Sequence, residues 1–166
     1  MDATDKRILN LLQRDASLSL VELADRVGLS TSPCWRRIQA LEKSGVIRQR
    51  VALLDPDRLG LGLAAFVRVR TNQHNQAWFD SFATAVEKID EIVEFYRMSG
   101  DLDYLLKIVV PDIAGYDAVY KRLIASVDLT DVSASFVMEE IKATTELPLD
   151  YTGTNNPPSS GSGKRR

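Results

Sequence analysis

The chain has 166 residues, 45% of them hydrophobic, and a formal net charge of −2. This length supports one or two small domains, and the near-neutral charge argues against a protein that coats nucleic acid through charge alone. A single cysteine excludes an intrachain disulfide and favours a reducing compartment. The N-terminus does not resemble a signal peptide, and no apolar run approaches the roughly 20 residues of a membrane span. We therefore expect a soluble, cytoplasmic protein without membrane contact.

Charge is distributed unevenly along the chain. Residues 1–54 carry 9 Lys/Arg and 6 Asp/Glu, a net charge of +3, whereas residues 55–166 carry 12 and 17, a net charge of −5. A basic N-terminal part joined to an acidic remainder fits a DNA-binding domain attached to a domain that does not touch DNA. The first predicted domain therefore spans residues 1–54.

Two helices are predicted at the start of this domain. The first covers Asp5–Ala16, where apolar residues recur at helical spacing. The second begins near Leu20, because Ser19 and Glu22 have the spacing of a capping box. It ends at Gly28, where a left-handed C-terminal turn is favoured.

A third helix follows a tight turn and ends at about Ser44, before Gly45. With the second helix it forms a predicted helix-turn-helix unit over Ser19–Ile47, the arrangement that places one helix in the DNA major groove. A helical wheel at about 100° per residue gives the third helix two sides. The buried side holds Cys34, Ile38 and Leu41, the outward side holds Ser32, Arg36, Gln39 and Lys43, and Trp35 and Arg37 flank the buried stripe.

The outward side of the third helix carries residue types that bond to DNA. Arginine suits guanine and glutamine suits adenine, so Arg36 and Gln39 are predicted to contact bases. Phosphate contacts are assigned to Ser32, Arg37 and Lys43. An ordinary solvated helix would carry similar residues, but the short capped helix before it favours DNA binding. The cysteine on the buried side is interpreted as a small core residue rather than a redox sensor.

The residues after the third helix are predicted to form a β-wing and then a linker. Val46–Leu54 reads as extended, with Arg48 and Arg50 on one face, where they would contact phosphates. The solvent-exposed face of a strand explains these arginines almost as well. Residues 55–62 contain Pro56 and two glycines, which interrupt both periodicities, so they are predicted to be a linker.

The remainder of the chain predicts the order β-α-β-β-α-β. Strands are expected at Leu63–Thr71, Ile92–Met98, Tyr104–Val110 and Val132–Ile141, with helices at Gln76–Ile89 and Ile113–Val127. This order is the ferredoxin-like split motif, an antiparallel sheet with two helices on one face, so the chain is predicted to be α+β. Apolar residues on both sides of the strands suggest that a second subunit covers the other face. This domain spans residues 63–151, and residues 152–166 are expected to be a disordered tail.

Several segments together resemble the Lrp/AsnC family of transcription regulators, also called feast/famine regulators, across about residues 2–150. They read DATDKRILNLLQRDA, ELADRVGLSTSPCWRRIQALEKSGVI, LDPDRLG, SGDLDYLLKIVV and FVMEEIKATTELPL. Their order and spacing span both predicted domains. The resemblance implies an N-terminal winged helix-turn-helix domain and a C-terminal regulatory domain. It also implies homodimers formed through the sheets, which assemble into tetramers or octamers.

The same resemblance implies an amino-acid effector, held near the turn between the second and third strands. On this sequence the site comprises Met98, Ser99, Gly100, Asp101, Asp103 and Tyr104, with Ser135 from a facing subunit. An α-amino acid needs donors for its carboxylate and an acceptor for its ammonium. Backbone N–H groups around Gly100 and the carboxylate of Asp101 or Asp103 supply both. This composition is also ordinary for a turn.

The sequence therefore predicts a sequence-specific DNA-binding transcription regulator, controlled by an amino acid or related small molecule. One alternative is a nucleoid-type architectural protein that wraps double-stranded DNA without small-molecule control. Another is a small-molecule-binding enzyme with a ferredoxin-like domain, against which the absence of a convergent catalytic set argues. A lone His74 and a lone cysteine far apart in sequence give little basis for a metal site or a nucleophile. We assign no catalytic residue, metal or cofactor.

Overall fold

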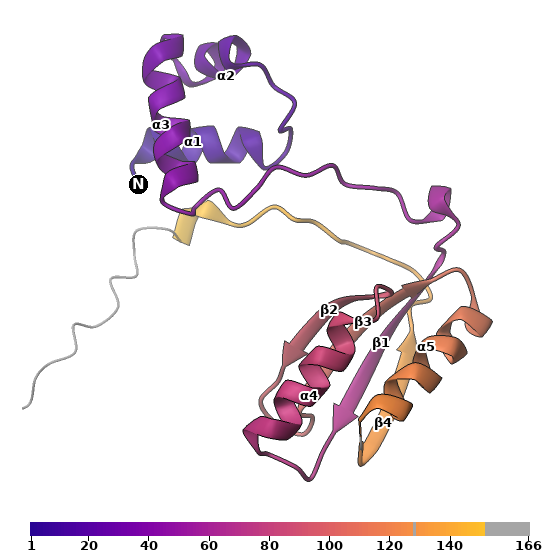
Figure 1. The fold of residues 1–166 in the computed structure, drawn as a ribbon. Coiled ribbons are helices and arrows are strands. Elements are labelled where there is room, and N and C mark those ends of the chain that lie inside the picture. Colours follow the sequence, from indigo (N-terminus) through magenta and orange to yellow (C-terminus); the bar gives the residue numbers. More distant parts are fainter. Residues whose placement is uncertain (128, 152–166) are drawn as a thin grey trace, which may run out of the picture. The chain divides into compact units, whose positions relative to one another are not determined.

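The computed structural model describes residues 1–127 and 129–151, which form two compact units. The first unit combines residues 1–53 with residues 142–151, and the second lies within residues 54–141 (Figure 1). The predicted tail at 152–166 lies outside the described residues. In the part of the chain that is described, no helix is long and apolar enough to cross a membrane.

Three helices form the first unit: α1 (Ala3–Leu12), α2 (Leu20–Val27) and α3 (Thr31–Lys43). The first helix starts and ends earlier than predicted, because Asp2 caps it in a reciprocal pair of 2.8 and 2.9 Å hydrogen bonds with Asp5. The capping box between Ser19 and Glu22 is confirmed. So is the left-handed Gly28 after α2, with φ of 70°.

The three helices enclose a small core in which all the fully buried side chains are aliphatic or sulfur-containing. The predicted buried side of α3 is confirmed, since Cys34, Ile38 and Leu41 are at most 5% exposed. Burial also raises the pKa of the Cys34 thiol, which keeps it protonated and unreactive. The structure therefore supports a packing role for this cysteine.

Residues 142–151, here called the C-terminal segment, pack on the first unit, although the sequence analysis placed them in the second domain. The side-chain amide of Gln13 exchanges two hydrogen bonds with the backbone of Leu147, at 2.9 and 3.1 Å. Arg14 pairs with Glu146 at 2.9 Å, and Leu149 packs against the core. These contacts join residues more than 130 positions apart, so no local pattern in the sequence announces them.

The segment predicted as a wing, Val46–Leu54, is irregular rather than a β-strand, because no residue in that range pairs as a strand. Its backbone is held to the unit by a 3.1 Å bond from the N–H of Ile47 to the carbonyl of Leu41. The apolar Val51 and Leu53 are 60% and 72% exposed. An alternating pattern indicates that a segment can be a strand, but a strand also needs a neighbouring strand for its backbone groups.

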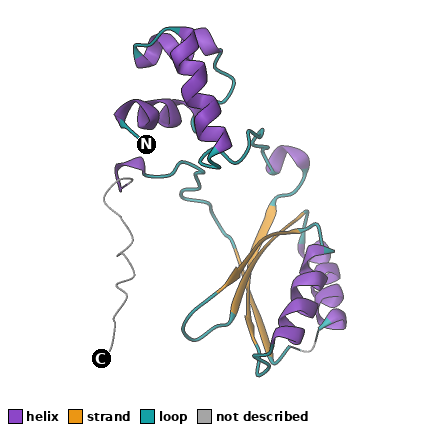
Figure 2. Ribbon diagram, turned by 60° about the vertical axis from the view of Figure 1, so that its left-hand side comes forward, coloured by secondary structure: helices purple, strands orange, loops and turns teal. Residues whose placement is uncertain are grey.

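The second unit has the predicted β-α-β-β-α-β order. Its elements are β1 (Leu63–Arg70), α4 (Gln76–Glu87), β2 (Ile92–Arg97), β3 (Tyr104–Val110), α5 (Ile113–Ser126) and β4 (Asp131–Phe136). The strands form an antiparallel sheet in the order β2-β3-β1-β4, and Figure 2 shows both helices on one face of it. The last strand ends at Phe136 rather than at Ile141, because its pairing with β1 ends with Phe136 opposite Ala65, and one further bond joins the N–H of Val137 to the carbonyl of Ala64.

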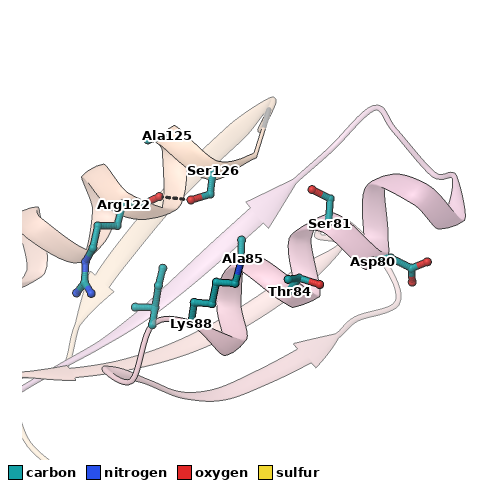
Figure 3. Close-up of a pocket in the computed structure, with 9 residues that line it drawn as sticks. Asp80, Ser81, Thr84, Ala85, Lys88, Arg122, Ala125 and Ser126 are labelled. Atoms are coloured by element: carbon teal, nitrogen blue, oxygen red, sulfur yellow. Dashed lines mark hydrogen bonds between the residues drawn. The ribbon is translucent and has the colours of Figure 1, made fainter.

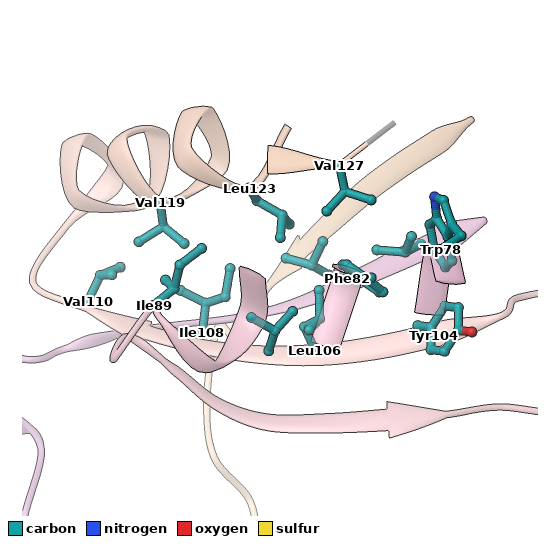
Figure 4. Packing of buried hydrophobic residues seen from close by; sticks show 13 residues of the cluster. Trp78, Phe82, Ile89, Tyr104, Leu106, Ile108, Val110, Val119, Leu123 and Val127 are labelled. Carbon is teal, nitrogen blue, oxygen red and sulfur yellow. The ribbon is translucent and has the colours of Figure 1, made fainter. Parts of the chain in front are cut away.

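Most buried side chains between the sheet and the helices are aliphatic, and a cluster of aromatic rings packs among them around Phe82 (Figure 4). Phe82 of α4 is fully buried, with ring centroids 5.1 Å from Trp78 and 5.2 Å from Tyr104. The opposite face of the sheet carries apolar side chains that stay accessible, such as Phe66 at 36% and Tyr96 at 49% exposed. The second unit is therefore two-layered, with one sheet face uncovered in the single chain.

Candidate functional site

The outward side of α3 is exposed as predicted. Ser32, Arg36, Gln39 and Lys43 all lie on the surface. Within the described residues, neither Arg36 nor Lys43 takes part in an ion pair. Trp35 is 52% exposed and, with Arg36 and Leu20, lines a cavity of about 300 Å³ at the N-terminal end of the helix. This side of α3 offers donors, two uncompensated cations and an apolar ring to a partner.

Arg37, which was predicted to flank the buried stripe of α3 and to contact a phosphate, is engaged by two carboxylates of the same unit. Its guanidinium pairs with the carboxylates of Asp2 and Asp5, both at 2.7 Å, and so ties α3 to the start of α1. The hydrogen bonds that Arg37 donates to the carboxylates of Asp5 and Asp2 raise the pKa of Arg37. The backbone N–H of Asp5 and then the Arg37 guanidinium lower the pKa of Asp2. A side chain held by two carboxylates is poorly placed to neutralise a phosphate.

Glu42 holds two of the predicted DNA-contacting residues. Its Oε2 accepts a 2.9 Å hydrogen bond from Nε2 of Gln39, one turn earlier on α3. Its Oε1 pairs at 3.0 Å with Arg50, which belongs to the segment after the helix. Glu42 was not among the residues predicted for function, although its i,i+3 spacing from Gln39 indicates that they are neighbours on a helix surface. Arg48, by contrast, is exposed, and no ion pair involves it in the described chain.

The predicted effector site lies in the turn between β2 and β3. A 2.8 Å bond from the N–H of Met98 to the carbonyl of Asp103 closes this turn, and Gly100 has a φ of 103°, a region that favours glycine. Nε of Arg70 donates to the carbonyl of Asp101 at 2.6 Å. The end of β1 therefore braces the turn from a neighbouring strand.

The two candidate carboxylates in the turn differ in what they already bind. One oxygen of Asp103 accepts the backbone N–H of Thr71 at 2.8 Å, and the other lies 3.9 Å from Nδ1 of His74. The exposed carboxylate of Asp101 makes no such bond in the described chain. This contrast makes Asp101 the better acceptor for a ligand ammonium, with Asp103 shaping the turn.

The other predicted effector residues have distinct surroundings. Met98 is 40% exposed and Ser99 lies on the surface, whereas Tyr104 is 6% exposed and its ring packs against Phe82 in the core. Ser135 lies in β4 opposite Phe66, while the turn begins beyond the pairing of Val69 with Tyr104. A single chain therefore does not include Ser135 in the turn.

A separate cavity of about 760 Å³ lies between α4 and α5, away from the residues predicted for function (Figure 3). Its lining includes Ser81, Thr84, Lys88 and Arg122, but the guanidinium of Arg122 already pairs with Glu91. Among the residues that the structure describes, no group of three His, Cys, Asp or Glu side chains is arranged to hold a metal ion.

Comparison with known families matches both units. Residues 1–48 match the family described as winged helix-turn-helix DNA-binding, and residues 64–147 match the Lrp/AsnC ligand binding domain. A glutamate uptake regulatory protein of Zymomonas mobilis is 51% identical over 152 residues, which cover 92% of this chain and 93% of that protein.

Solved structures give the same result for the fold. An AsnC family transcriptional regulator from Agrobacterium tumefaciens is 57% identical with a TM-score of 0.89, over 92% of this chain and 99% of that one. A transcriptional regulator of Neisseria meningitidis, solved in complex with L-methionine, is 40% identical with a TM-score of 0.86, over 90% and 97%. With an N-terminal winged helix-turn-helix domain and a C-terminal ligand-binding domain, this chain belongs to the Lrp/AsnC family of transcriptional regulators.

Proposed function

We propose that this regulator reads double-stranded DNA through the exposed side of α3, and that an amino acid bound at the turn between β2 and β3 controls the binding. The observation that carries the first half is the exposed row of polar side chains on α3, in which Arg36 and Lys43 lack a carboxylate partner among the described residues. Arginine there suits guanine, and Gln39 suits adenine.

The proposed DNA contacts divide into bases and phosphates. Base contacts are assigned to Arg36 and Gln39. Phosphate or sugar contacts are assigned to Ser32, Trp35, Lys43, Arg48 and Arg50. Arg37 leaves this set because two carboxylates hold it. In a dimer, two such helices would enter major grooves at half-sites separated by about one or more helical turns, of ~10 bp each.

Replacing Arg36 by alanine tests the assignment. We expect discrimination between a duplex selected by the protein from a randomised library and a random duplex to fall by about 1–3 kcal/mol, with the fold intact. Arg7→Ala removes the same charge from the exposed surface of α1 and should preserve discrimination. Unchanged discrimination in Arg36→Ala would refute the base contact. A wild-type protein that selects no sequence would instead favour an architectural role.

The effector half of the proposal rests on the chemistry of the turn. Gly100 allows the backbone of the turn to approach a ligand closely, and Asp101 presents an unengaged carboxylate for an ammonium group. The L-methionine complex of the Neisseria relative supports an amino acid as the ligand class. Met98, Ser99 and the backbone of Asp103 and Tyr104 would complete the site, with Ser135 from another subunit.

A thermal-shift screen with the twenty amino acids tests the effector site. A ligand at 100 times its Kd adds about 2.7 kcal/mol to stability, which is easily measured. Asp101→Asn should abolish the shift, whereas Asp90→Asn, an exposed carboxylate before β2, should retain it. If no amino acid shifts the melting temperature of the wild-type protein, the effector proposal fails.

We also propose that the uncovered sheet face pairs with a second copy, giving homodimers that build larger assemblies. The supporting observation is that apolar side chains on that face, including Phe66 and Tyr96, remain accessible in the single chain. Phe66→Glu would bury a charge in such an interface, and light scattering should then report a monomer. An unchanged mass would contradict this interface.

A further inference from the structure

We propose that Glu42 is a specificity-determining positioning residue, which orients Gln39 and Arg50 toward DNA without itself contacting a base. This inference rests on the proposed DNA-binding function. It starts from one carboxylate whose two oxygens are used separately, Oε2 by Gln39 at 2.9 Å and Oε1 by Arg50 at 3.0 Å. Glu42 is partly buried at the flank of α3, between the outward side and the core side.

The bond to Glu42 fixes the orientation of the Gln39 amide. A glutamine amide has two N–H donors and one carbonyl acceptor, and it rotates freely unless something holds it. Because the Glu42 carboxylate only accepts hydrogen bonds, the NH₂ end of the Gln39 amide faces Glu42. The second N–H and the carbonyl oxygen remain for adenine, which needs one donor and one acceptor from the same side chain. Less side-chain entropy is then lost when Gln39 reads a base.

The other oxygen of Glu42, Oε1, restricts the position of the Arg50 guanidinium. Because residues 46–54 form no strand, the segment lacks a strand ladder that would place Arg50. The ion pair with Glu42 joins this exposed segment to the end of α3. A guanidinium has five N–H donors, so the pair leaves donors for a phosphate.

A carboxylate beside two DNA-contacting residues also repels phosphate. Wild-type affinity for any DNA is therefore lower than it would be without this charge, whereas discrimination between sequences is higher. Removal of Glu42 should change these two quantities in opposite directions. If Glu42 only stabilised the fold, its removal would instead lower the affinity for every DNA sequence by the same factor.

The experiment measures binding of the full chain to two duplexes, one selected by the wild-type protein from a randomised library and one of random sequence. In Glu42→Ala we expect binding to random DNA to strengthen about twofold or more, as one phosphate-repelling charge is lost. We expect the preference for the selected duplex to fall about tenfold, chiefly at adenine positions. Asp25→Asn removes one exposed carboxylate charge from α2 and is the charge control.

Two further variants separate orientation from charge. Glu42→Gln retains an acceptor for Gln39 but not the ion pair, so its loss of preference should be intermediate. In a Gln39→Ala background, Glu42→Ala should cause little further loss of adenine preference, because the oriented amide is already absent. Each variant is first checked for an unchanged melting temperature.

The outcomes distinguish this inference from the proposed function. If the wild-type protein selects a sequence and Glu42→Ala retains the full preference, the positioning role is wrong while the DNA-binding function stands. Equal weakening on both duplexes, with a lower melting temperature, would show a purely structural role and also overturn the inference. A wild-type protein that selects no sequence would refute the proposed function itself, and the positioning role with it.

Discussion

The candidate sites of the two units differ in how far apart in the sequence their residues lie. In the first unit the predicted base contacts, Arg36 and Gln39, lie within one turn of a single helix, α3. In the second unit the turn between β2 and β3 is held by Arg70 and Thr71, which lie 31 and 32 residues before their partners. Helical periodicity therefore defines the first site, whereas the second depends on which strands become neighbours.

The cores of the two units differ in the same way. The first unit has a small aliphatic core of helix residues close together in sequence, supplemented by the C-terminal segment. The core of the second unit also contains an aromatic cluster, in which Phe82 of α4 meets Phe95 of β2 and Tyr104 of β3. Changes in the core of the second unit should therefore affect the turn between β2 and β3.

The largest expected effect follows from Phe82→Ala. Phe82 is fully buried and its ring lies near those of Trp78, Phe95 and Tyr104. Such a truncation costs about 3–5 kcal/mol, because it loses transfer free energy and leaves a cavity. Denaturant unfolding followed by tryptophan fluorescence in a Trp35→Phe background would report on the second unit through Trp78.

The control for this prediction is Phe79→Ala, whose side chain is only partly buried against the same core and should cost less. DNA binding by the first unit would be measured in parallel. If Phe82→Ala were no more destabilising than Phe79→Ala, the aromatic cluster would not be the main support of the second unit.

Elements whose signals are local were predicted well from the sequence. The capping box of Ser19 and Glu22, the buried side of α3 and the β-α-β-β-α-β order all depend on spacing within a few residues. The end of β4 was not predicted, because strand length depends on the neighbour: the pairing with β1 ends at Ala65 and Phe136, and the apolar Met138 and Ile141 beyond it are 95% and 83% exposed.

Parts of the candidate sites were not predictable for the same reason. A wheel shows that Arg37 flanks the core, but not that Asp2 and Asp5 on α1 face it. Composition suggests that Asp101 and Asp103 are equivalent, whereas the bond from the backbone N–H of Thr71 to the Asp103 carboxylate distinguishes them. Charged side chains take partners across space, and periodicity carries no information about them.

The next effect in size concerns the turn itself. Gly100→Ala places a Cβ at a φ of 103°, which costs about 1–3 kcal/mol in strain even though no atom lies within 4 Å of that Cβ. We expect the turn to change shape and amino-acid binding to weaken, as measured by thermal shift. Gly62→Ala, in the linker without such a φ, should leave binding unchanged. Full binding by Gly100→Ala would remove the turn from the effector site.

A smaller effect should follow from Gln13→Ala, which releases both hydrogen bonds to the backbone of Leu147. Because the pair is exposed, we expect a loss of about 1 kcal/mol in the first unit. Faster amide hydrogen exchange at Leu147 is the direct measurement. Gln49→Ala, on the exposed segment after α3, is the matched control and should leave exchange at Leu147 unchanged. Equal exchange in both variants would show that the C-terminal segment is held by Leu149 and Arg14 alone.

The smallest expected effect is a pH dependence confined to the start of α2. The hydroxyl and backbone N–H of Ser19 lower the pKa of Glu22 below its ordinary value of 4.5. A lowered folded-state pKa means that the carboxylate stabilises the folded unit above about pH 4.5, and that this contribution disappears as pH falls through the folded pKa. Ser19→Ala should therefore lower the melting temperature by a few degrees at pH 7, and the difference from the wild-type protein should shrink toward pH 3. Thr4→Ala, near the start of α1, should show no such convergence. A constant difference for Ser19→Ala at all pH values would mean that only the pH-independent cap, from the N–H of Glu22 to the Ser19 hydroxyl, supports this helix.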